Sequence, residues 1–132
     1  MSKFTFLSCS LLLVLAGNLV AETPPAAETV LKALRSPDAD ERIAAGRALH
    51  DVTNLPATSA ATLVEGMGDR YFCVRIGSAA ALVRLGEPAV PHLGRALSSI
   101  NYHHRFGAAQ TLGQIGAAAR PAMPELGKAL SD

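Results

Sequence analysis

The chain has 132 residues, a length that suffices for one domain of ordinary size. Apolar residues make up 49% of it, aromatic residues only 5%, and tryptophan is absent, which disfavours a β-sandwich and favours closely packed helices. With a formal net charge of only +1, the chain lacks the strongly basic balance that is typical of nucleic-acid-binding proteins.

The first 21 residues have the pattern of a secretory signal peptide. Lys3 is followed by no charged residue until Glu22, and residues 11–16 form a short apolar core before a stretch of small residues. We expect cleavage after Ala21, with Ala16 as the alternative site. The protein should then be exported, either to a periplasm or as a secreted protein. An uncleaved signal that anchors the chain in a membrane is the alternative.

Cleavage would change both the charge and the cysteine content of the protein. Loss of Lys3 and Cys9 leaves 11 basic and 11 acidic residues, so the mature chain would have no net charge. Such a chain has no global field to concentrate it on nucleic acid or anionic lipid, and we expect neither nucleic acid nor a membrane as a partner. Cys73 would be the remaining cysteine, and its apolar surroundings in sequence predict a packed core thiol.

After a short linker at 22–29, residues 30–132 form a domain of internal repeats. One block recurs around Arg42, Arg75 and Arg105, at intervals of 33 and 30 residues. A second block alternates with it. Its two best copies lie at 89–98 and 122–131, with a partial copy at 30–34 and a weaker one at 62–67. Two blocks that alternate in fixed order are typical of stacked repeats.

Both blocks have helical periodicity. Helices of alternating type are predicted, in chain order, at about 26–35, 39–52, 58–68, 72–85, 88–98, 103–115 and 121–130. Gly86 and Gly116 stand where a helix would end in the left-handed helical conformation, which glycine adopts at little cost. Pro88 suits the first turn of the next helix, whereas Pro91 and Pro124 indicate an irregular first turn.

The helices that contain the repeated arginines share an apolar pattern. We expect one buried face in each, formed by Ile43, Leu49 and Val52, by Ile76, Leu82 and Leu85, and by Phe106, Leu112 and Ile115. A single helical pair cannot bury its apolar face, so neighbouring pairs must stack. The predicted fold is therefore all-α, an α-α superhelix of about three stacked helical hairpins.

From about residue 30 to the C-terminus, the sequence resembles the HEAT-repeat family, specifically the short repeats first noted in phycobilin-lyase-like proteins. The resemblance lies in the pattern Val-Arg-x-x-Ala-Ala-x-Ala-Leu-x-x-Leu-Gly, found with small substitutions at 74–86, and in Ala-Val-Pro-x-Leu-x-x-Ala-Leu at 89–97. It implies a HEAT-like solenoid.

The resemblance also implies a brace at each turn between helices, made by an Asp that pairs with the repeat arginine six residues later. Asp69 and Arg75 match that spacing. Ser36 and Ser99 stand in place of the Asp in the other two repeats, so the resemblance does not carry this brace over to Arg42 and Arg105.

No residue pattern indicates catalysis. The branch of the family that resembles deoxyhypusine hydroxylase carries His-Glu dyads directly after the repeat arginine, and the matching pairs here are Ile43-Ala44, Ile76-Gly77 and Phe106-Gly107, which cannot ligate a metal. The four histidines, His50, His92, His103 and His104, lack the i, i+4 spacing of a helical zinc site. No nucleophile motif or phosphate-binding loop occurs. We expect no catalytic residue, no metal and no cofactor.

The leading functional hypothesis is an exported scaffold that binds a protein partner and is not an enzyme. The resemblance implies that the helices containing the second block, which alternate with those of the repeated arginines, line a concave face. The predicted partner-binding residues are Glu65, His92, Arg95, Tyr102, His103, His104, Glu125 and Lys128. One alternative is an accessory subunit of a lyase-type enzyme resembling the phycobilin-lyase group. Another is a self-assembling module, a homo-oligomer formed through the C-terminal repeat by an exposed apolar end around Leu126 and Leu130.

Overall fold

The computed structural model describes residues 25–131, and in that range the chain forms helices and turns without strands. The elements are α1 (Ala27–Leu34), α2 (Ala39–Ala48), η2 (Ala57–Ser59), α3 (Ala60–Met67), α4 (Phe72–Leu85), η3 (Glu87–Ala89), α5 (Val90–Ala96), α6 (Tyr102–Ile115), η4 (Gly116–Ala122) and α7 (Met123–Ser131). None of the helices in this range is long and apolar enough to span a bilayer. The predicted signal peptide at 1–21, with its cleavage site, lies outside the described residues.

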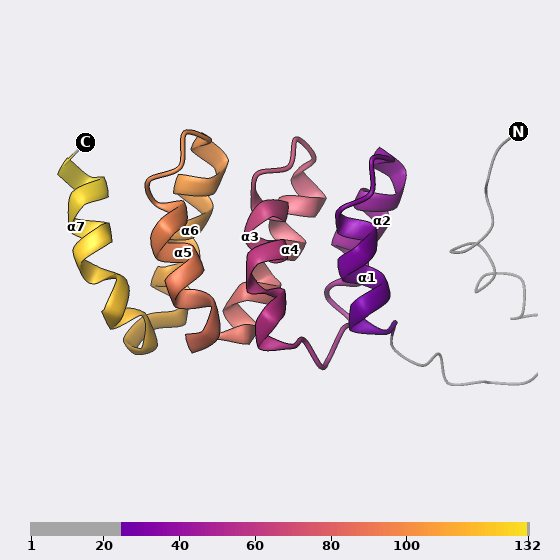
Figure 1. Ribbon diagram of the computed structural model, residues 1–132, viewed down its shortest axis with the longest axis horizontal. Coiled ribbons are helices and arrows are strands. Elements are labelled where there is room, and N and C mark those ends of the chain that lie inside the picture. The colour runs from indigo at the N-terminus through magenta and orange to yellow at the C-terminus, as the bar shows by residue number, and fades with distance from the viewer. Residues whose placement is uncertain (1–24, 132) are drawn as a thin grey trace, which may run out of the picture.

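The helices form two layers (Figure 1). Helices α1, α3, α5 and α7 stand in one row, which we call the odd layer, and α2, α4 and α6 stand behind them as the even layer. Successive helices pack as the hairpins α1–α2, α3–α4 and α5–α6, and neighbouring hairpins contact one another through both layers. This arrangement confirms the predicted all-α stack of about three hairpins, with α7 packed against α5 and η4 at the end of the row.

Most of the predicted helices are confirmed within one or two residues. The predicted irregular first turns are also present, because the short 3-10 segments η3 and η4 lead into α5 and α7. The exception is α2, which ends at Ala48 and not at residue 52. The carbonyl groups of Leu49 and His50 accept hydrogen bonds from the Arg84 guanidinium on α4, so the chain turns away from the helix at this point.

The two glycines that were predicted to end helices have positive φ, as expected. Gly86 and Gly116 have φ of 70° and 73°. Their ψ values of −131° and −129° lie outside the left-handed helical region that was anticipated. This conformation is sterically open to glycine alone, so it turns the chain sharply from α4 into η3 and from α6 into η4.

The core contains one leucine that recurs in each hairpin, directly after α2 and within α4 and α6. Leu49, Leu82 and Leu112 are buried to within 1% of their surface. The prediction that Ile76 and Phe106 share this buried face is wrong, because their side chains are 43% and 56% exposed. Six residues turn a helix by about 600°, which places the first apolar residue of each block about 120° around the helix from its leucine.

Two glycines allow α2 and α4 to approach closely at the seam between the first two hairpins. A Cβ atom on Gly46 would lie 2.7 Å from the Cα atom of Val74 and 2.9 Å from the carbonyl oxygen of Cys73. A Cβ atom on Gly77 would overlap the carbonyl oxygen of Gly46. The obstructing atoms belong to the backbone, so a larger residue could be accommodated only by moving a helix.

Replacement of Gly46 by Ala should therefore destabilise the fold. Overpacking of this kind costs about 1–3 kcal/mol, which exceeds the helix-propensity gain of alanine over glycine. The matched control is Gly113→Ala on α6, where a Cβ atom meets nothing within 4 Å and the propensity gain should stabilise the protein by about 0.5–1 kcal/mol. Urea unfolding followed by circular dichroism measures both. Equal shifts of the two midpoints in the same direction would contradict the close approach.

Candidate partner-binding site

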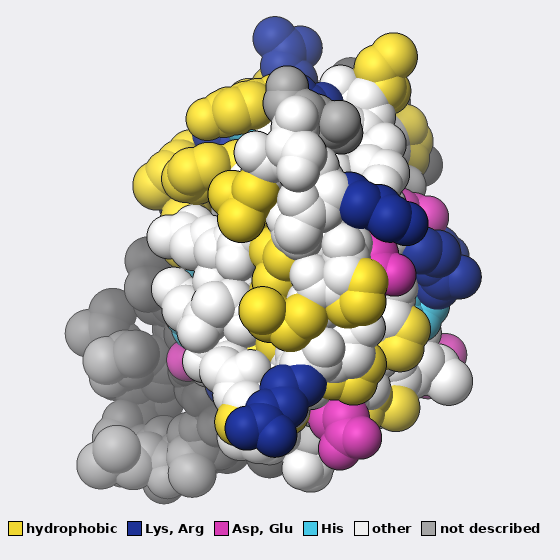
Figure 2. Space-filling model, turned by 90° about the vertical axis from the view of Figure 1, so that its left-hand side faces the viewer, with side chains coloured by type: hydrophobic (Ala, Val, Ile, Leu, Met, Phe, Trp, Pro, Cys, Tyr) yellow, Lys and Arg dark blue, Asp and Glu magenta, His cyan; other side chains and the backbone are white. Residues whose placement is uncertain are grey.

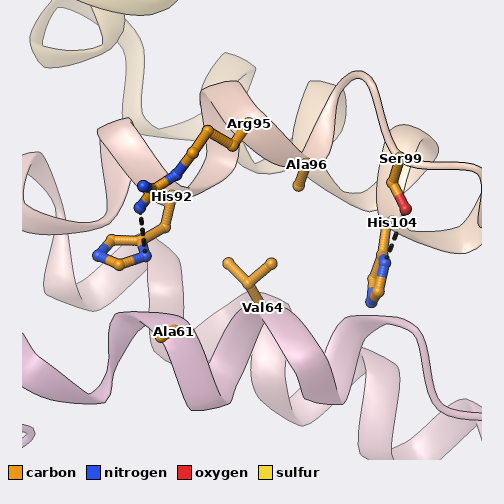
Figure 3. Close-up of a pocket in the computed structure, with 7 residues that line it drawn as sticks. All are labelled: Ala61, Val64, His92, Arg95, Ala96, Ser99 and His104. Carbon is orange, nitrogen blue, oxygen red and sulfur yellow. Dashed lines mark hydrogen bonds between the residues drawn. The ribbon is translucent and has the colours of Figure 1, made fainter.

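A cleft of about 340 Å³ lies between α3 and α5 in the odd layer (Figure 3). Its lining residues are Ala61, Val64, His92, Arg95, Ala96, Ser99 and His104. His92 and Arg95 lie at one end, Ser99 and His104 lie at the other, and Val64 and Ala96 face each other between them. The structure thus brings together three of the residues predicted from the sequence, namely His92, Arg95 and His104.

The end formed by His92 and Arg95 offers hydrogen-bond donors. Nη2 of Arg95 lies 3.1 Å from Nδ1 of His92. A guanidinium group can only donate, so Nδ1 accepts this hydrogen bond and the neutral ring carries its proton on Nε2. The histidine and the arginine therefore both present N–H groups at this end of the cleft.

His104 closes the other end of the cleft and links two hairpins. Its Nε2 lies 3.5 Å from the carbonyl oxygen of Glu65, which can only accept, so the ring donates there over a long contact. Its Nδ1 lies 3.1 Å from Oγ of Ser99, which donates to the ring and accepts from the backbone N–H of Asn101. Gly68 makes room for the ring, because a Cβ atom there would overlap Nε2.

A second cleft, of about 420 Å³, lies between α5 and the start of α7. Arg95 lines it as well, opposite Glu125. Oε2 of Glu125 is buried and has no hydrogen-bond partner among residues 25–131. Lys128 is exposed on the same helix. Arg95 therefore stands between two neighbouring clefts on the odd layer.

The remaining predicted residues do not line these clefts. Glu65 forms an exposed ion pair with Arg35, with Oε2 and Nε 3.1 Å apart. Tyr102 and His103 belong to the start of α6 in the even layer, and the Tyr102 ring stacks on that of Phe106 at 5.9 Å between centroids. Of the apolar residues named for self-assembly, Leu130 is exposed and Leu126 is half-buried against the core.

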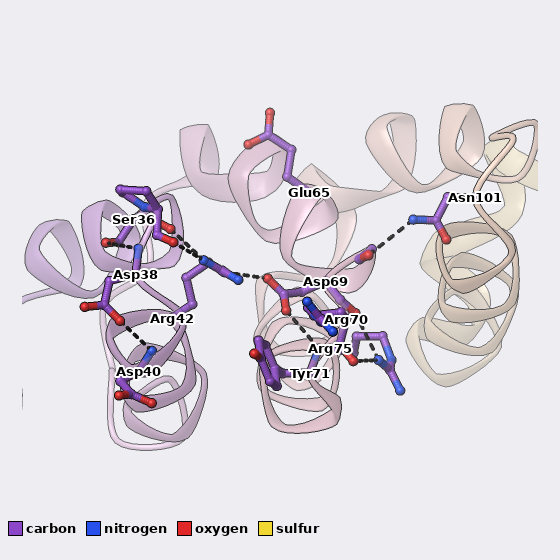
Figure 4. A network of polar contacts seen from close by, with 12 residues as sticks. Ser36, Asp38, Asp40, Arg42, Glu65, Asp69, Arg70, Tyr71, Arg75 and Asn101 are labelled. Atoms are coloured by element: carbon purple, nitrogen blue, oxygen red, sulfur yellow. Dashed lines mark hydrogen bonds and ion pairs between the residues drawn. The ribbon is translucent and has the colours of Figure 1, made fainter.

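Each turn that leads from an odd-layer helix to an even-layer helix is held by a repeat arginine, and Figure 4 shows two of them, Arg42 and Arg75. Its Nη1 donates to the two carbonyl oxygens that lie six and five residues earlier in the chain. The pairs are Arg42 with Ser36 and Pro37, Arg75 with Asp69 and Arg70, and Arg105 with Ser99 and Ile100, at 2.8–3.1 Å. We call these three side chains the turn arginines.

The carboxylate of Asp69 does not pair with Arg75, contrary to the prediction. It lies 2.8 Å from Nε of Arg42, the turn arginine of the preceding hairpin, and both side chains are largely buried. Its other oxygen accepts the backbone N–H of Tyr71. Ser36 and Ser99 perform this second task in their own turns, accepting from the N–H group two residues later. The brace is therefore kept in all three turns, because it uses backbone carbonyls.

Sequence reasoning missed one polar link between hairpins. Asn101 caps α6, since its Oδ1 accepts the backbone N–H of His103 at 2.9 Å. Its Nδ2 also donates to the carbonyl oxygen of Gly68 in the preceding turn, at 3.2 Å. The sequence did contain a signal for the cap, because Asn is a preferred N-cap residue and Asn101 stands just before a predicted helix. Asp38 occupies the matching position before α2.

The described residues show no gathering of three or more His, Cys, Asp or Glu side chains that could hold a metal ion. Cys73 is half-buried and packs against the core, in keeping with the predicted packed thiol.

Stacked helical hairpins, each with an arginine brace in its internal turn, form an α-α solenoid. Residues 105–132, which contain most of α6 together with η4 and α7, match the family described as PBS lyase HEAT-like repeat. The match confirms, for residues 105–132, the resemblance to a HEAT-like repeat of the PBS lyase type seen in the sequence. The chain shows no significant match to a curated protein.

The ion pair between hairpins should make Arg42 the most important of the turn arginines for stability. Arg42→Met removes the two carbonyl contacts and also strands the largely buried Asp69 carboxylate, and we expect it to cost about 3–5 kcal/mol. Arg105→Met is the matched control. It removes the same two carbonyl contacts where Ser99 replaces the Asp, at an expected cost of about 1–2 kcal/mol. Equal losses in urea unfolding would show that the ion pair contributes nothing.

Proposed function

We propose that the protein is an exported scaffold that binds a protein partner through the odd layer. The observation that carries the proposal is the position of Arg95, which lies between two clefts and has no carboxylate partner among the described residues. An arginine so placed can bind a group from a second molecule without first breaking an internal ion pair.

The groups around Arg95 favour a particular kind of partner segment. Arg95 and His92 present N–H donors at one end of the first cleft, whereas Val64 and Ala96 offer apolar surface beside them. A carboxylate suits the donors, because guanidinium and imidazole N–H groups make charge-assisted hydrogen bonds to it. A partner segment with an Asp or Glu next to an apolar side chain would satisfy both parts of the cleft.

We propose no catalytic step for these residues. The turn arginines and His104 already serve the backbone of the turns, and Glu65 is paired with Arg35. Among the predicted partner-binding residues of the odd layer, His92, Arg95 and Lys128 can offer N–H groups to a partner, and Glu125 can offer a carboxylate. They are suited to binding by hydrogen bonds and charge.

Substitution of Arg95 should weaken partner binding without unfolding the protein. We expect Arg95→Ala combined with Lys128→Ala to lower the affinity for the partner captured from the source cell by about 10- to 100-fold, the usual range for loss of a charged hydrogen-bond partner at an interface. Arg47→Ala is the control, since Arg47 is an exposed arginine on α2 in the even layer. Capture by the wild-type protein identifies the partner, and calorimetry with that partner measures the affinities.

An unchanged affinity in the double variant would remove the odd layer from consideration. An equal loss in Arg47→Ala would point to a general dependence on charge.

Export makes a separate prediction about the N-terminus. Protein isolated from the source cell should begin at Glu22, because the small residue Ala21 ends the apolar segment as a cleavage site requires. Mass spectrometry of the intact protein measures this directly. A chain that retains residues 1–21 and sediments with membranes would support the anchored alternative.

A further inference from the structure

A second surface, distinct from the clefts, lies on the even layer. Phe72 and Ile76 on α4, and Tyr102 and Phe106 on α6, are large hydrophobic side chains with 43–69% of their surface exposed. Ile100, in the turn before α6, is fully exposed. We call these five residues the aromatic edge. Hydrophobic side chains gather at the upper left of Figure 2, on the side of the even layer.

The repeat places these side chains in one continuous surface. Phe72 and Tyr102 are 30 residues apart, as are Ile76 and Phe106, so each pair occupies equivalent positions in neighbouring hairpins. Within each helix the two side chains are four residues apart and lie on the same face. Helices α4 and α6 pack against each other, so the two rows are adjacent.

The charge around the aromatic edge has one sign. Helices α4 and α6 contain Arg75, Arg84 and Arg105 and no acidic residue. Arg70, in the turn before α4, adds to this positive charge, and the carboxylate of its neighbour Asp69 is largely buried and paired with Arg42. The Arg75 guanidinium lies over the Phe72 ring at 5.8 Å, so positive charge and aromatic surface are in direct contact. The net charge of the whole chain conceals this segregation, and the expectation of no membrane partner was based on that net charge.

We propose that the aromatic edge binds the surface of an anionic lipid bilayer. Aromatic rings that sit at headgroup depth and arginines that face anionic headgroups are the two features by which peripheral proteins bind such a surface. None of the aromatic edge residues lines the clefts described above, so this surface is separate from the proposed partner-binding site.

A second copy of the chain is a poor occupant for the same surface. Two copies that met through it would bring Arg70, Arg75 and Arg105 of each towards those of the other, with no carboxylate on α4 or α6 to offset them. The charge is complementary to an anionic surface.

The chain contains no tryptophan, so a single introduced tryptophan reports on its own surroundings. Phe106→Trp should show a blue-shifted emission on addition of vesicles that contain phosphatidylglycerol, and quenching when the acyl chains carry bromine. Vesicles of phosphatidylcholine alone should give little change. Met123→Trp on α7 is the matched control, because Met123 and Phe106 are 60% and 56% exposed, and it should not respond. Tyr102→Trp provides a second reporter if Phe106→Trp perturbs folding.

The experiment uses the full chain, because each tryptophan reports only on its own surroundings. If the chain bound vesicles through another segment, the tryptophans at 106 and 123 would respond alike. No shift for either edge reporter, or equal shifts for the edge and for residue 123, would overturn the proposal. A shift with a poly-glutamate peptide but not with vesicles would also overturn it, in favour of an acidic protein segment.

Arg70 tests the charge separately, since its guanidinium lies over Tyr71 and makes no turn contact among the described residues. Arg70→Ser should lower the affinity for phosphatidylglycerol vesicles about fivefold. The exposed Arg120 on η4 lies outside the edge, and Arg120→Ser should leave that affinity nearly unchanged. Equal losses would show a general electrostatic attraction and would count against this site.

Discussion

Each hairpin of this solenoid depends on one arginine that donates to the backbone of its own turn. The last carbonyl groups of an odd-layer helix and of the turn after it have no helical partner, and unpaired polar groups near the core are costly. A turn arginine such as Arg105 satisfies two of them with a single nitrogen and thereby fixes the direction in which the even-layer helix leaves. The position of His104, and with it one end of the cleft between α3 and α5, follows from that geometry.

The helices and their order could be predicted because the repeat presents each weak signal several times. Gly86 and Gly116 illustrate this, since one glycine after an apolar residue says little, whereas two at matching places define the end of a helix. Burial was harder to predict. Ile76 and Phe106 are apolar and recur in register, yet they are exposed. An apolar residue is not obliged to be inside, and small residues such as Ala81 on α4 and Ala108 on α6 occupy buried positions of these helices.

Contacts between hairpins were the part that the sequence could not supply. Spacing within one repeat suggests that Asp69 forms an ion pair with Arg75. In the structure its carboxylate pairs with Arg42, which is 27 residues earlier in the chain. That choice depends on the offset between neighbouring hairpins, which is set by how closely residues such as Gly46 and Gly77 let the helices approach. The predicted partner-binding residues fall on two different layers for a related reason. His92 and Arg95 share an odd-layer helix, whereas Tyr102 and His103 start a helix in the other layer.

The solenoid is only two helices thick, so its core cannot enclose a deep pocket, and its chemistry must lie on its two outer surfaces. These surfaces differ in charge. The odd layer carries both signs, with Glu65 and Glu125 among Arg95 and Lys128, whereas α4 and α6 of the even layer carry arginines alone. Both surfaces are supported by the same core leucines, Leu82 and Leu112 among them. A change in the core should therefore disturb both surfaces together. A change on either surface can leave the other intact, so the two proposed binding surfaces could vary independently.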